Sequence, residues 1–574
     1  MSMQQAPERR KSPWTRYVPI IAVVVVAGIV IAVFAGGGDD GGSSCASGPK
    51  PNATTGVVTY GAAKQAGDLD QYTWQEHCDT ETGRVAIPLT GAPPCVNVQQ
   101  PTAGAPVRGV TADTIRIGRY VAKPDLQADF LARQTGTYDS PEAAAQTFEN
   151  YVDIYGSVFE LYGRTVEVVP IEGTGGGADA VAARRDAATA EAKNVFAVVG
   201  GPIQAKEFSE ELARRKIVCI VCTSAQPEKF YLDNQPYVWP LGPTPDQTAT
   251  MVTELIEKQL VGKPAQYGGP DVNGKPRTFA MLTYNTPDGQ FTSSWDDLER
   301  KVKATGADLK ARITNYLDIP NLERDGRLVA AKLKASGATT IIFTGDPITP
   351  AFFTKEMTKA GYFPEWVMGG TVYADTNVFA RSFDQEQWKH AMGIKLTPVG
   401  IPKPKQQAYT LHEWWFGTPP PAENAFAVTQ GNLNLLFLGL QMAGPNLSPD
   451  TFAAGMRSLG PGSSTEEPVI TPIVTFGDWG LWPGTTVDTG GLDNAGVIYW
   501  DPEATGTDET GAEGKGMYRA LENGLRYLTG QWPTKPLPLF EPEGTVTQYP
   551  LDDIPPEFVP PVVPVPPDAP AAKG

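Results

Sequence analysis

Between about residue 109 and residue 545, short apolar runs alternate with segments whose apolar residues recur at helical spacing. A helix is predicted to begin at Ser140 and Pro141, because the serine hydroxyl can cap the first free amides and proline fits the first turn. Phe148, Val152, Tyr155 and Phe159 then recur on one face of it. The same pattern predicts strands at 115–118, 165–169, 195–199 and 217–221, and helices at 178–192 and 207–215.

The alternation of apolar runs and helical segments repeats after Pro243-Thr-Pro-Asp246. It predicts helices at 246–260, 327–336 and 350–360, the last two stopped by Gly337 and Gly361, and strands at 278–283 and 340–343. Strands that alternate with amphipathic helices are typical of a mainly parallel sheet covered on both faces. We therefore predict an α/β fold of two lobes, each a doubly wound, mainly parallel sheet. A ligand-binding cleft is expected between them, at the carboxyl ends of their strands.

The N-terminal segment carries a membrane signal. Arg9, Arg10, Lys11 and Arg16 precede the uncharged run 17–35, and two aspartates follow it. Its length and the preceding positive charge predict a single-pass transmembrane anchor, with the N-terminus inside and the main domain extracytoplasmic. The alternative is a cleaved signal peptide ending at Val33-Phe-Ala35, which would secrete the protein. Cys45 is a poor lipid-anchor site, because no apolar residue stands in the Gly-Gly-Ser-Ser before it.

Composition separates the ends from the body. Residues 36–108 are rich in Gly, Ser, Pro and Ala and are expected to form a linker with a small disulfide-stapled arm. Residues 546–574 are Pro-rich and are expected to be an extended tail. The formal net charge of −17, with no basic cluster after residue 16, argues against nucleic acid as a partner.

Five cysteines allow at most two disulfides. Cys78 and Cys95 flank a Pro- and Gly-rich stretch and are predicted to be bonded. Cys219 and Cys222 fall in or just after an apolar strand, where residues three apart point to opposite faces. We therefore expect these two to be packing residues unless the strand bends at Val221, in which case a redox disulfide lining the cleft is the alternative.

The run Val195-Phe-Ala-Val-Val-Gly-Gly201, a helix, and then Arg215-Lys-Ile-Val-Cys-Ile-Val-Cys-Thr-Ser224 resembles type I periplasmic binding proteins of the branched-chain amino acid class, the solute receptors of ABC importers. Met281-Leu-Thr-Tyr-Asn285, Ile341-Ile-Phe-Thr-Gly-Asp346 and Met357-Thr-Lys-Ala-Gly-Tyr362 extend the resemblance, which covers roughly residues 109–545. It implies three crossings between the lobes, near Leu241, Thr397 and Thr471. Lobe 1 would then comprise 109–241 and 398–470, and lobe 2 would comprise 242–397 and 471–545.

The resemblance also implies which residues hold a ligand. In lobe 1 these are Gln204, in the loop 201–204, together with Thr223 and Ser224, where exposed amides suit an anion. In lobe 2 they are Tyr284, Asp288, Asp346, Pro347, Thr371 and Tyr373. The chain departs from the family at Gly369-Gly-Thr-Val-Tyr373, where amino-acid receptors usually place a carboxylate for the ligand's ammonium.

We interpret the remaining motifs as structural features rather than as functional sites. Glu172-Gly-Thr-Gly-Gly-Gly-Ala178 partly matches a dinucleotide fingerprint, but it follows the second strand and lacks the acidic partner, so a loose turn is expected. His77, His390 and His412 form no metal or nucleophile constellation. The acidic groups 296–299 and 501–509 are expected on a solvated helix face and a surface loop. We therefore predict no catalytic residue, no metal and no cofactor.

The sequence thus favours an extracytoplasmic receptor that captures a small polar solute, an amino acid, amide or small carboxylate, and presents it to an ABC importer permease. A membrane-tethered sensor of the same fold is the alternative. An enzyme that uses the cleft ranks third, for want of a catalytic constellation.

Overall fold

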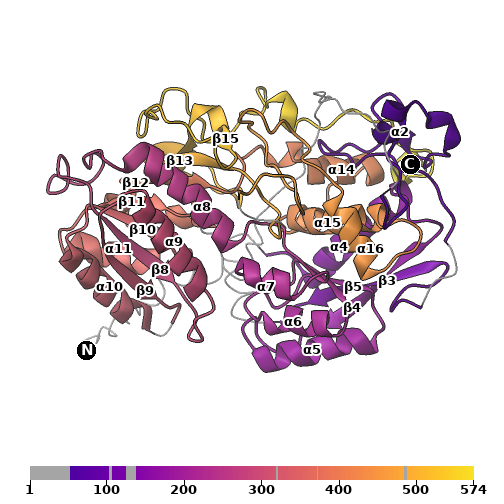
Figure 1. The fold of residues 1–574 in the computed structure, drawn as a ribbon, viewed down its shortest axis with the longest axis horizontal. Coiled ribbons are helices and arrows are strands. Elements are labelled where there is room, and N and C mark those ends of the chain that lie inside the picture. The colour runs from indigo at the N-terminus through magenta and orange to yellow at the C-terminus, as the bar shows by residue number, and fades with distance from the viewer. Residues whose placement is uncertain are drawn as a thin grey trace, which may run out of the picture.

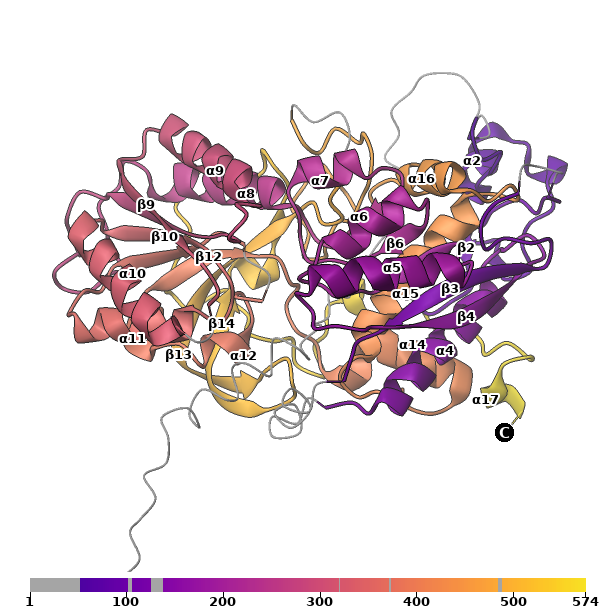
Figure 2. The ribbon, with the colours of Figure 1, turned by 90° about the horizontal axis from the view of Figure 1, so that it is seen from below.

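The computed structural model describes residues 52–101, 106–124, 138–318, 321–370, 373–483 and 488–573. Two α/β lobes lie side by side, each with a sheet between layers of helices (Figure 1). The same two bodies are evident from below (Figure 2). The predicted two-lobed α/β architecture with parallel sheets is confirmed.

Lobe 1 contains a five-stranded sheet in the order β4-β3-β5-β6-β7, and every pair of neighbours is parallel. Its strands are β3 (Thr114–Val121), β4 (Thr165–Glu172), β5 (Ala197–Val199), β6 (Val218–Ile220) and β7 (Val238–Trp239).

Helices cover both faces of this sheet. They are α4 (Pro141–Val158), α5 (Ala180–Ala192), α6 (Glu207–Arg214) and α7 (Glu228–Asp233), followed much later in the chain by α14 (Gln407–Phe416), α15 (Phe426–Met442) and α16 (Pro449–Arg457). One face packs against α4, α14, α15 and α16 through a core that includes Ile117 and Leu436, and the other packs against α5 and α6 through a core that includes Phe208.

The start of α4 follows the predicted capping chemistry. Ser140 Oγ accepts a hydrogen bond from Ala143 N at 3.1 Å, and Pro141 occupies the first turn. The predicted apolar residues Phe148, Val152 and Tyr155 are buried in the lobe 1 core. Local sequence therefore sets both the start of this helix and the face that it buries.

Lobe 2 contains an eight-stranded sheet in the order β14-β13-β12-β11-β10-β8-β9, with β15 paired to β13. The strands β8 to β12 are parallel to one another, and β13 to β15 are antiparallel additions. The strands are β8 (Phe279–Tyr284), β9 (Leu309–Asn315), β10 (Thr340–Thr344), β11 (Glu365–Met368), β12 (Ala391–Lys395), β13 (Ala495–Thr507), β14 (Glu513–Ala520) and β15 (Arg526–Tyr527).

The helices of lobe 2 are α8 (Pro245–Leu255), which continues as a π-helical turn η3 (Ile256–Leu260), α9 (Thr292–Ala304), α10 (Leu322–Ser336), α11 (Pro350–Lys359), α12 (Asn377–Ala380) and α13 (Gln385–Trp388). Thr244 and Gln247 form a reciprocal capping box at the start of α8. The helix predicted at 327–336 begins earlier, at Leu322, so the sequence pattern found its C-terminal end at Gly337 but not its start.

One expectation about the cysteines is wrong. Val221 has a φ of 51°, so the backbone leaves the strand just after β6, and Cys219 and Cys222 come to a Cα–Cα distance of 5.8 Å and are joined by a disulfide. Alternation along an extended strand would have kept them apart, but the strand ends between them. Both cysteines are buried in the lobe 1 core.

The N-terminal arm, residues 52–101, contains α2 (Tyr60–Ala66), η2 (Leu69–Gln71), β1 (Cys78–Asp79) and β2 (Arg84–Val85). The predicted bond between Cys78 and Cys95 is confirmed. The arm is more than a stapled spacer, because Val85, Ile87 and Leu89 enter the lobe 1 core. The arm therefore shares the hydrophobic core of lobe 1, and the composition of the arm alone does not reveal this long-range packing.

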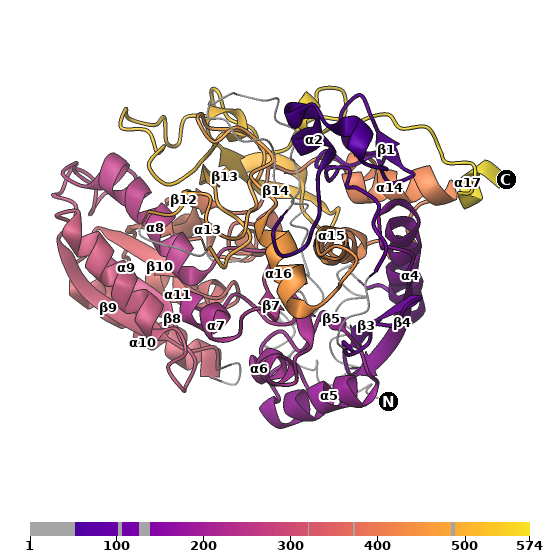
Figure 3. The ribbon, with the colours of Figure 1, turned by 45° about the vertical axis from the view of Figure 1, so that its right-hand side comes forward.

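The chain passes between the lobes after β7, after β12 and before β13. The C-terminal segment, with η7 (Pro556–Phe558) and α17 (Pro570–Lys573), runs back along lobe 1 and ends beside α14 (Figure 3). Trp414 Nε1 donates to Val563 O at 3.0 Å and fixes this segment. In the described residues no helix combines the length and the apolarity needed to cross a bilayer, and the predicted anchor at 17–35 lies outside those residues.

Candidate ligand-binding cleft

The loops at the carboxyl ends of the two sheets meet each other. Lys206, after β5, pairs with Asp288, after β8, at 3.4 Å. Gln290 Nε2 donates to Gln226 Oε1, which follows β6. Because these contacts join loops at the strand ends of both lobes, the carboxyl edges of the two sheets face each other, where α/β folds bind ligands.

The lobe 1 wall is built from the loops after β5 and β6. Thr223 is buried, and its Oγ1 donates to Ile203 O at 3.4 Å and accepts from Gln226 Nε2 at 3.2 Å. The exposed Ser224 donates its amide to Ile203 O at 2.7 Å. Gln204 is exposed, and its amide donates to Gly177 O at 3.2 Å. The structure thus brings these three predicted residues onto two loops that are hydrogen-bonded together.

Close backbone approach sets the shape of this wall. A Cβ added to Gly201 would lie 2.3 Å from Cys222 O, so only glycine fits where the loop after β5 passes the disulfide. Gly200 has a φ of 77°, in the left-handed region. The Cys219–Cys222 disulfide and these glycines therefore hold the Thr223 segment against the 201–204 loop.

The lobe 2 wall contains Tyr284, Asp288 and Asp346. Burial raises the pKa of the Tyr284 hydroxyl, with further contributions from the charges of Asp346 and Asp288. A hydrogen bond from Thr286 and the nearby Lys206 ammonium lower the pKa of Asp288 despite its partial burial.

Asp346 has a structural task of its own. Its Oδ1 accepts from Ile348 N at 2.9 Å and Thr349 N at 2.8 Å, and its Oδ2 accepts from Thr349 Oγ1 at 2.7 Å. These bonds satisfy free amides just before α11. Burial raises the pKa of Asp346 above its usual value, although the same hydrogen bonds oppose the shift. The adjacent Pro347 is partly exposed.

The remaining predicted residues follow β11. Tyr373 has a φ of 74°, its carbonyl accepts from Thr376 Oγ1 at 2.6 Å, and its ring lies 6.5 Å from that of Phe379. Thr371 lies outside the described residues. Sequence reasoning missed Lys206, Gln226 and Gln290, which make the contacts between the lobes. Gln226 lies three residues after Thr223, and that spacing was the available signal.

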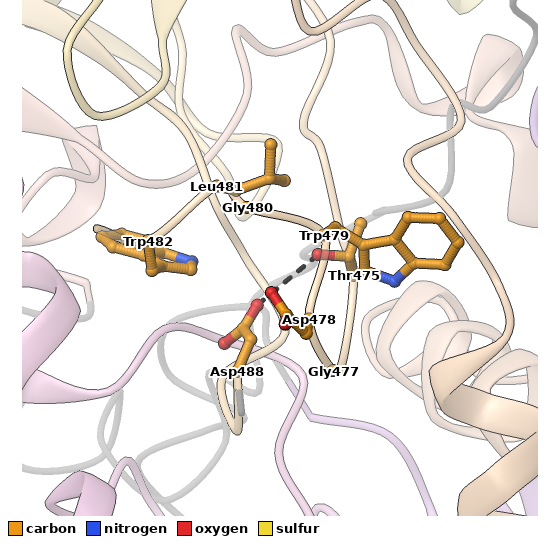
Figure 4. Close-up of a pocket in the computed structure, with 8 residues that line it drawn as sticks. All are labelled: Thr475, Gly477, Asp478, Trp479, Gly480, Leu481, Trp482 and Asp488. Carbon is orange, nitrogen blue, oxygen red and sulfur yellow. Dashed lines mark hydrogen bonds between the residues drawn. The ribbon is translucent and has the colours of Figure 1, made fainter. Parts of the chain in front are cut away.

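A small pocket occupies the third crossing rather than the cleft. It is lined by Thr475, Gly477, Asp478, Trp479, Gly480, Leu481, Trp482 and Asp488 (Figure 4). Its volume of about 10 Å³ is room for roughly one water molecule. Thr475 Oγ1 lies 3.5 Å from Asp488 Oδ2 and 2.9 Å from Asp493 Oδ2. The pocket is too small for a solute. It lies in the region where the three crossings join the two lobes, which we call the hinge.

This hinge pocket contains a pair of buried carboxyl groups. Asp488 Oδ1 accepts from Gln247 Nε2 at 2.6 Å, which ties the third crossing to the start of α8. Trp482 Nε1 donates to Asp493 Oδ1 at 2.8 Å. Burial and the neighbouring Asp493 raise the pKa of Asp488 far above its usual value, and burial raises the pKa of Asp493 to about 6. The pair therefore holds a proton that isolated aspartates would release at neutral pH.

Residues 130–384 match the sequence profile of the family described as periplasmic binding protein. With the topology above, the protein has the two-lobed fold of that class. No curated protein sequence matches the chain.

The solved structures to which this chain is similar are distant from it in sequence. An ABC transporter solute-binding protein from R. palustris, solved with 4-hydroxybenzoate, is 12% identical with a TM-score of 0.44, covering 73% of this chain and 99% of its own. A substrate-binding protein from Aeropyrum pernix is 12% identical with a TM-score of 0.48, covering 74% and 98%. A fatty acid ABC transporter protein from Thermomonospora curvata is 14% identical with a TM-score of 0.44, covering 74% and 94%.

Proposed function

We propose that this protein is an extracytoplasmic solute receptor, which captures a small polar molecule between its two lobes and presents it to an ABC importer. The observation that carries the proposal is the facing of the two carboxyl sheet edges, marked by the Lys206–Asp288 and Gln226–Gln290 contacts. Loops at such edges present amides and hydroxyls without helices or strands in the way. The family match over residues 130–384 supports the same function.

Capture requires that the two lobes move as units about the crossings. Where the third crossing meets the start of α8, the hydrogen-bonded side chains of Asp488 and Gln247 are buried. Lys206 and Asp288, at the cleft, are partly exposed. A ligand that contacts both lobes stabilises the closed form by its extra affinity for that form. A permease would then recognise the closed surface.

Location outside the cytoplasm is part of the proposal. The charged and apolar pattern of residues 9–40 supports a membrane anchor with the receptor domain outside, or else secretion. Two disulfides fit an oxidising compartment. Membrane attachment is tested by fractionating cells that express the full chain and the same chain without residues 1–35.

The ligand classes to test follow from the cleft and from the resemblance. Branched-chain amino acids are the first candidates by resemblance, and amides and small carboxylates follow, because the chain lacks the family's usual ammonium-binding carboxylate after β11. A thermal-shift screen over these classes should yield at least one solute that raises the melting temperature, since a ligand that binds only the folded form stabilises it. Mass spectrometry of the released ligand should find it chemically unchanged.

A substitution in the lobe 1 wall tests whether the best solute in that screen binds at the cleft. Thr223→Val removes a hydroxyl that bonds both Ile203 and Gln226, so affinity should fall about tenfold. Thr305→Val is the control, because Thr305 lies at the distant end of α9 and its hydroxyl also bonds a backbone carbonyl. Equal affinity in parent and Thr223→Val would place the pocket elsewhere. Co-purification with a permease favours transport, and co-purification with another membrane protein favours the sensor.

A further inference from the structure

The lobe 1 sheet has a topological switch point between β3 and β5. The strand order β4-β3-β5-β6-β7 means that the connection after β3 leaves toward β4, and the connection after β5 leaves toward β6. The α4 connection covers one face and the α6 connection covers the other. A switch point of this kind, at the carboxyl ends of two neighbouring strands, is where doubly wound sheets bind ligands.

Arg119 stands at this switch point. It lies near the end of β3 and pairs in register with Val199, the last residue of β5. Its guanidinium lies 5.9 Å from the centre of the Phe148 ring on α4, so one face of the group is covered by an aromatic side chain. The side chain is partly buried rather than extended into solvent.

This guanidinium has no polar partner among the described residues. Glu149 and Glu172 are near enough to influence its charge, yet Arg119 makes no hydrogen bond or ion pair in that part of the chain. Burial lowers its pKa, although those two carboxylates oppose the shift. Other partly buried arginines are occupied: Arg116, on the same strand, pairs with Glu167 at 3.1 Å, and Arg457 donates to Gln235 Oε1 at 2.7 Å. Among the described residues, a permanently charged group with five donors is therefore left without a polar partner at the switch point.

Backbone donors follow the neighbouring strand. In the loop after β5 the amides of Gly200, Gln204 and Ala205 are bonded within lobe 1. The amides of Gly201 and Ile203 donate to no described residue. A guanidinium at the end of β3 and free amides just after β5 are the groups that recognise a carboxylate.

The acidic groups of the opposite wall are already engaged. Asp288 pairs with Lys206, and both oxygens of Asp346 accept hydrogen bonds from residues that lead into α11. Asp375, which follows β11, is 1% exposed, and its Oδ2 accepts from Leu396 N and Thr397 N at the second crossing, while its buried Oδ1 has no hydrogen-bond partner among the described residues. The two carboxylates placed at the cleft wall, Asp288 and Asp346, are therefore both engaged, unlike the Arg119 guanidinium of lobe 1. A ligand that brings a negative charge without an ammonium group fits this imbalance best.

We propose that the cleft selects an organic monocarboxylate that carries no ammonium group, and that Arg119 is the residue that binds its carboxylate. This inference rests on the proposed function, because it needs a solute that enters between the lobes. It narrows the ligand range from amino acids, amides and carboxylates to one class. It also makes Arg119 the main determinant of specificity in lobe 1.

The test uses two sets of probes; within each set the carbon skeleton is the same and only the polar groups differ. They are 4-methylpentanoate, its amide and leucine, and 3-phenylpropanoate, its amide and phenylalanine. Calorimetric titration of the exported domain should give binding to at least one free acid, with about tenfold or weaker affinity for its amide and its amino acid. Arg119→Gln should lower affinity for that acid by about tenfold or more, and Arg119→Lys should lower it less. Arg116→Gln, the same change on the same strand, should leave affinity unchanged.

Each other outcome is decisive. If an amide or an amino acid binds as well as its acid, or if Arg119→Gln binds the acid as the parent does, the inference is overturned while solute capture stands. If none of the six probes binds, the monocarboxylate class is overturned. The proposed function is then judged by the broad screen, which also contains neutral and cationic solutes and fails only if no solute stabilises the domain. Circular dichroism and the melting temperature of each variant establish that it is folded.

Discussion

The cleft and the hinge use polar groups in opposite ways. At the cleft, the contacts between the lobes are made by side chains in reach of water, such as Lys206 and Asp288. Arg119, near the end of β3, has no hydrogen-bond or ion-pair partner among the described residues. At the hinge, Arg526 and Asp488 are buried and bonded. Exposed pairs are weak and exchange readily, whereas a buried polar group that loses its partners is strongly destabilising. The contrast suits a receptor whose lobes must separate at one edge and stay joined at the other.

The hinge is organised around one arginine. Arg526 is 2% exposed and donates to Leu396 O at 2.8 Å, Thr397 O at 3.2 Å and Asn494 O at 2.7 Å, so it joins the second crossing to the third. Burial lowers the pKa of its guanidinium to about 10, which leaves it charged at neutral pH. Its partners are mainly carbonyl groups rather than a carboxylate, so this residue acts as a structural clamp.

Removing that clamp is expected to have the largest effect. Arg526→Met strands several buried carbonyls and should lower the free energy of unfolding by about 3 kcal/mol or more, with a fall in melting temperature of roughly 5–10 °C. Differential scanning calorimetry measures it. Arg519→Met is the control, because Arg519 on β14 is more exposed and bonds Asp501, so its loss should be smaller. Equal losses in the two variants would remove the distinction between the hinge and an ordinary surface pair.

The carboxyl pair at the hinge predicts a pH dependence. Folding raises the pKa of both aspartates, so the folded state binds more protons than the unfolded state between the two sets of pKa values. The stability from this pair is full below the unfolded pKa and is lost as the pH rises through the folded values. Asp488→Asn mimics the protonated form. From about pH 5 to about pH 8 the melting temperature of the parent should therefore fall relative to this variant.

Asp288→Asn, at the cleft, is the control for this pH dependence. The pKa of Asp288 is lowered and its side chain is largely exposed, so the melting temperatures of this variant and of the parent should change in parallel with pH near neutrality. Parallel profiles for Asp488→Asn and the parent would mean that the buried pair does not take up a proton on folding.

The smallest effect is expected at the cleft pair. A double-mutant cycle with Lys206→Met and Asp288→Asn should give a coupling free energy of about 0.5 kcal/mol, which 0.5 M salt should reduce further. Lys515→Met and Glu503→Gln form the control cycle, because that exposed pair lies within lobe 2. A coupling of several kcal/mol at Lys206–Asp288 would show that the cleft is held shut like the hinge.

Sequence periodicity predicted much of the fold. The α4 helix forms where the Ser140-Pro141 signal and the spacing of Phe148, Val152 and Tyr155 place it, because capping and amphipathicity are local properties. The Cys78–Cys95 bond was also predicted, since both cysteines flank one short segment. Of the predicted ligand-binding residues, Gln204, Thr223 and Ser224 lie on two hydrogen-bonded loops of lobe 1, and Asp288 contacts Lys206 across the lobes. The ligand-binding roles of all the predicted residues stay predictions.

What the sequence determined by itself was the alternation of strands and helices, the capping signals and the apolar faces, all of which depend on neighbours within a few residues. Tertiary structure decided the rest. The disulfide at Cys219–Cys222 forms because Val221 turns out of the strand, and the arm gains a core only by packing on lobe 1. Which charges are paired is also decided by long-range packing: Arg116 and Arg119 lie on one strand, and among the described residues only Arg116 meets a carboxylate within ion-pair distance.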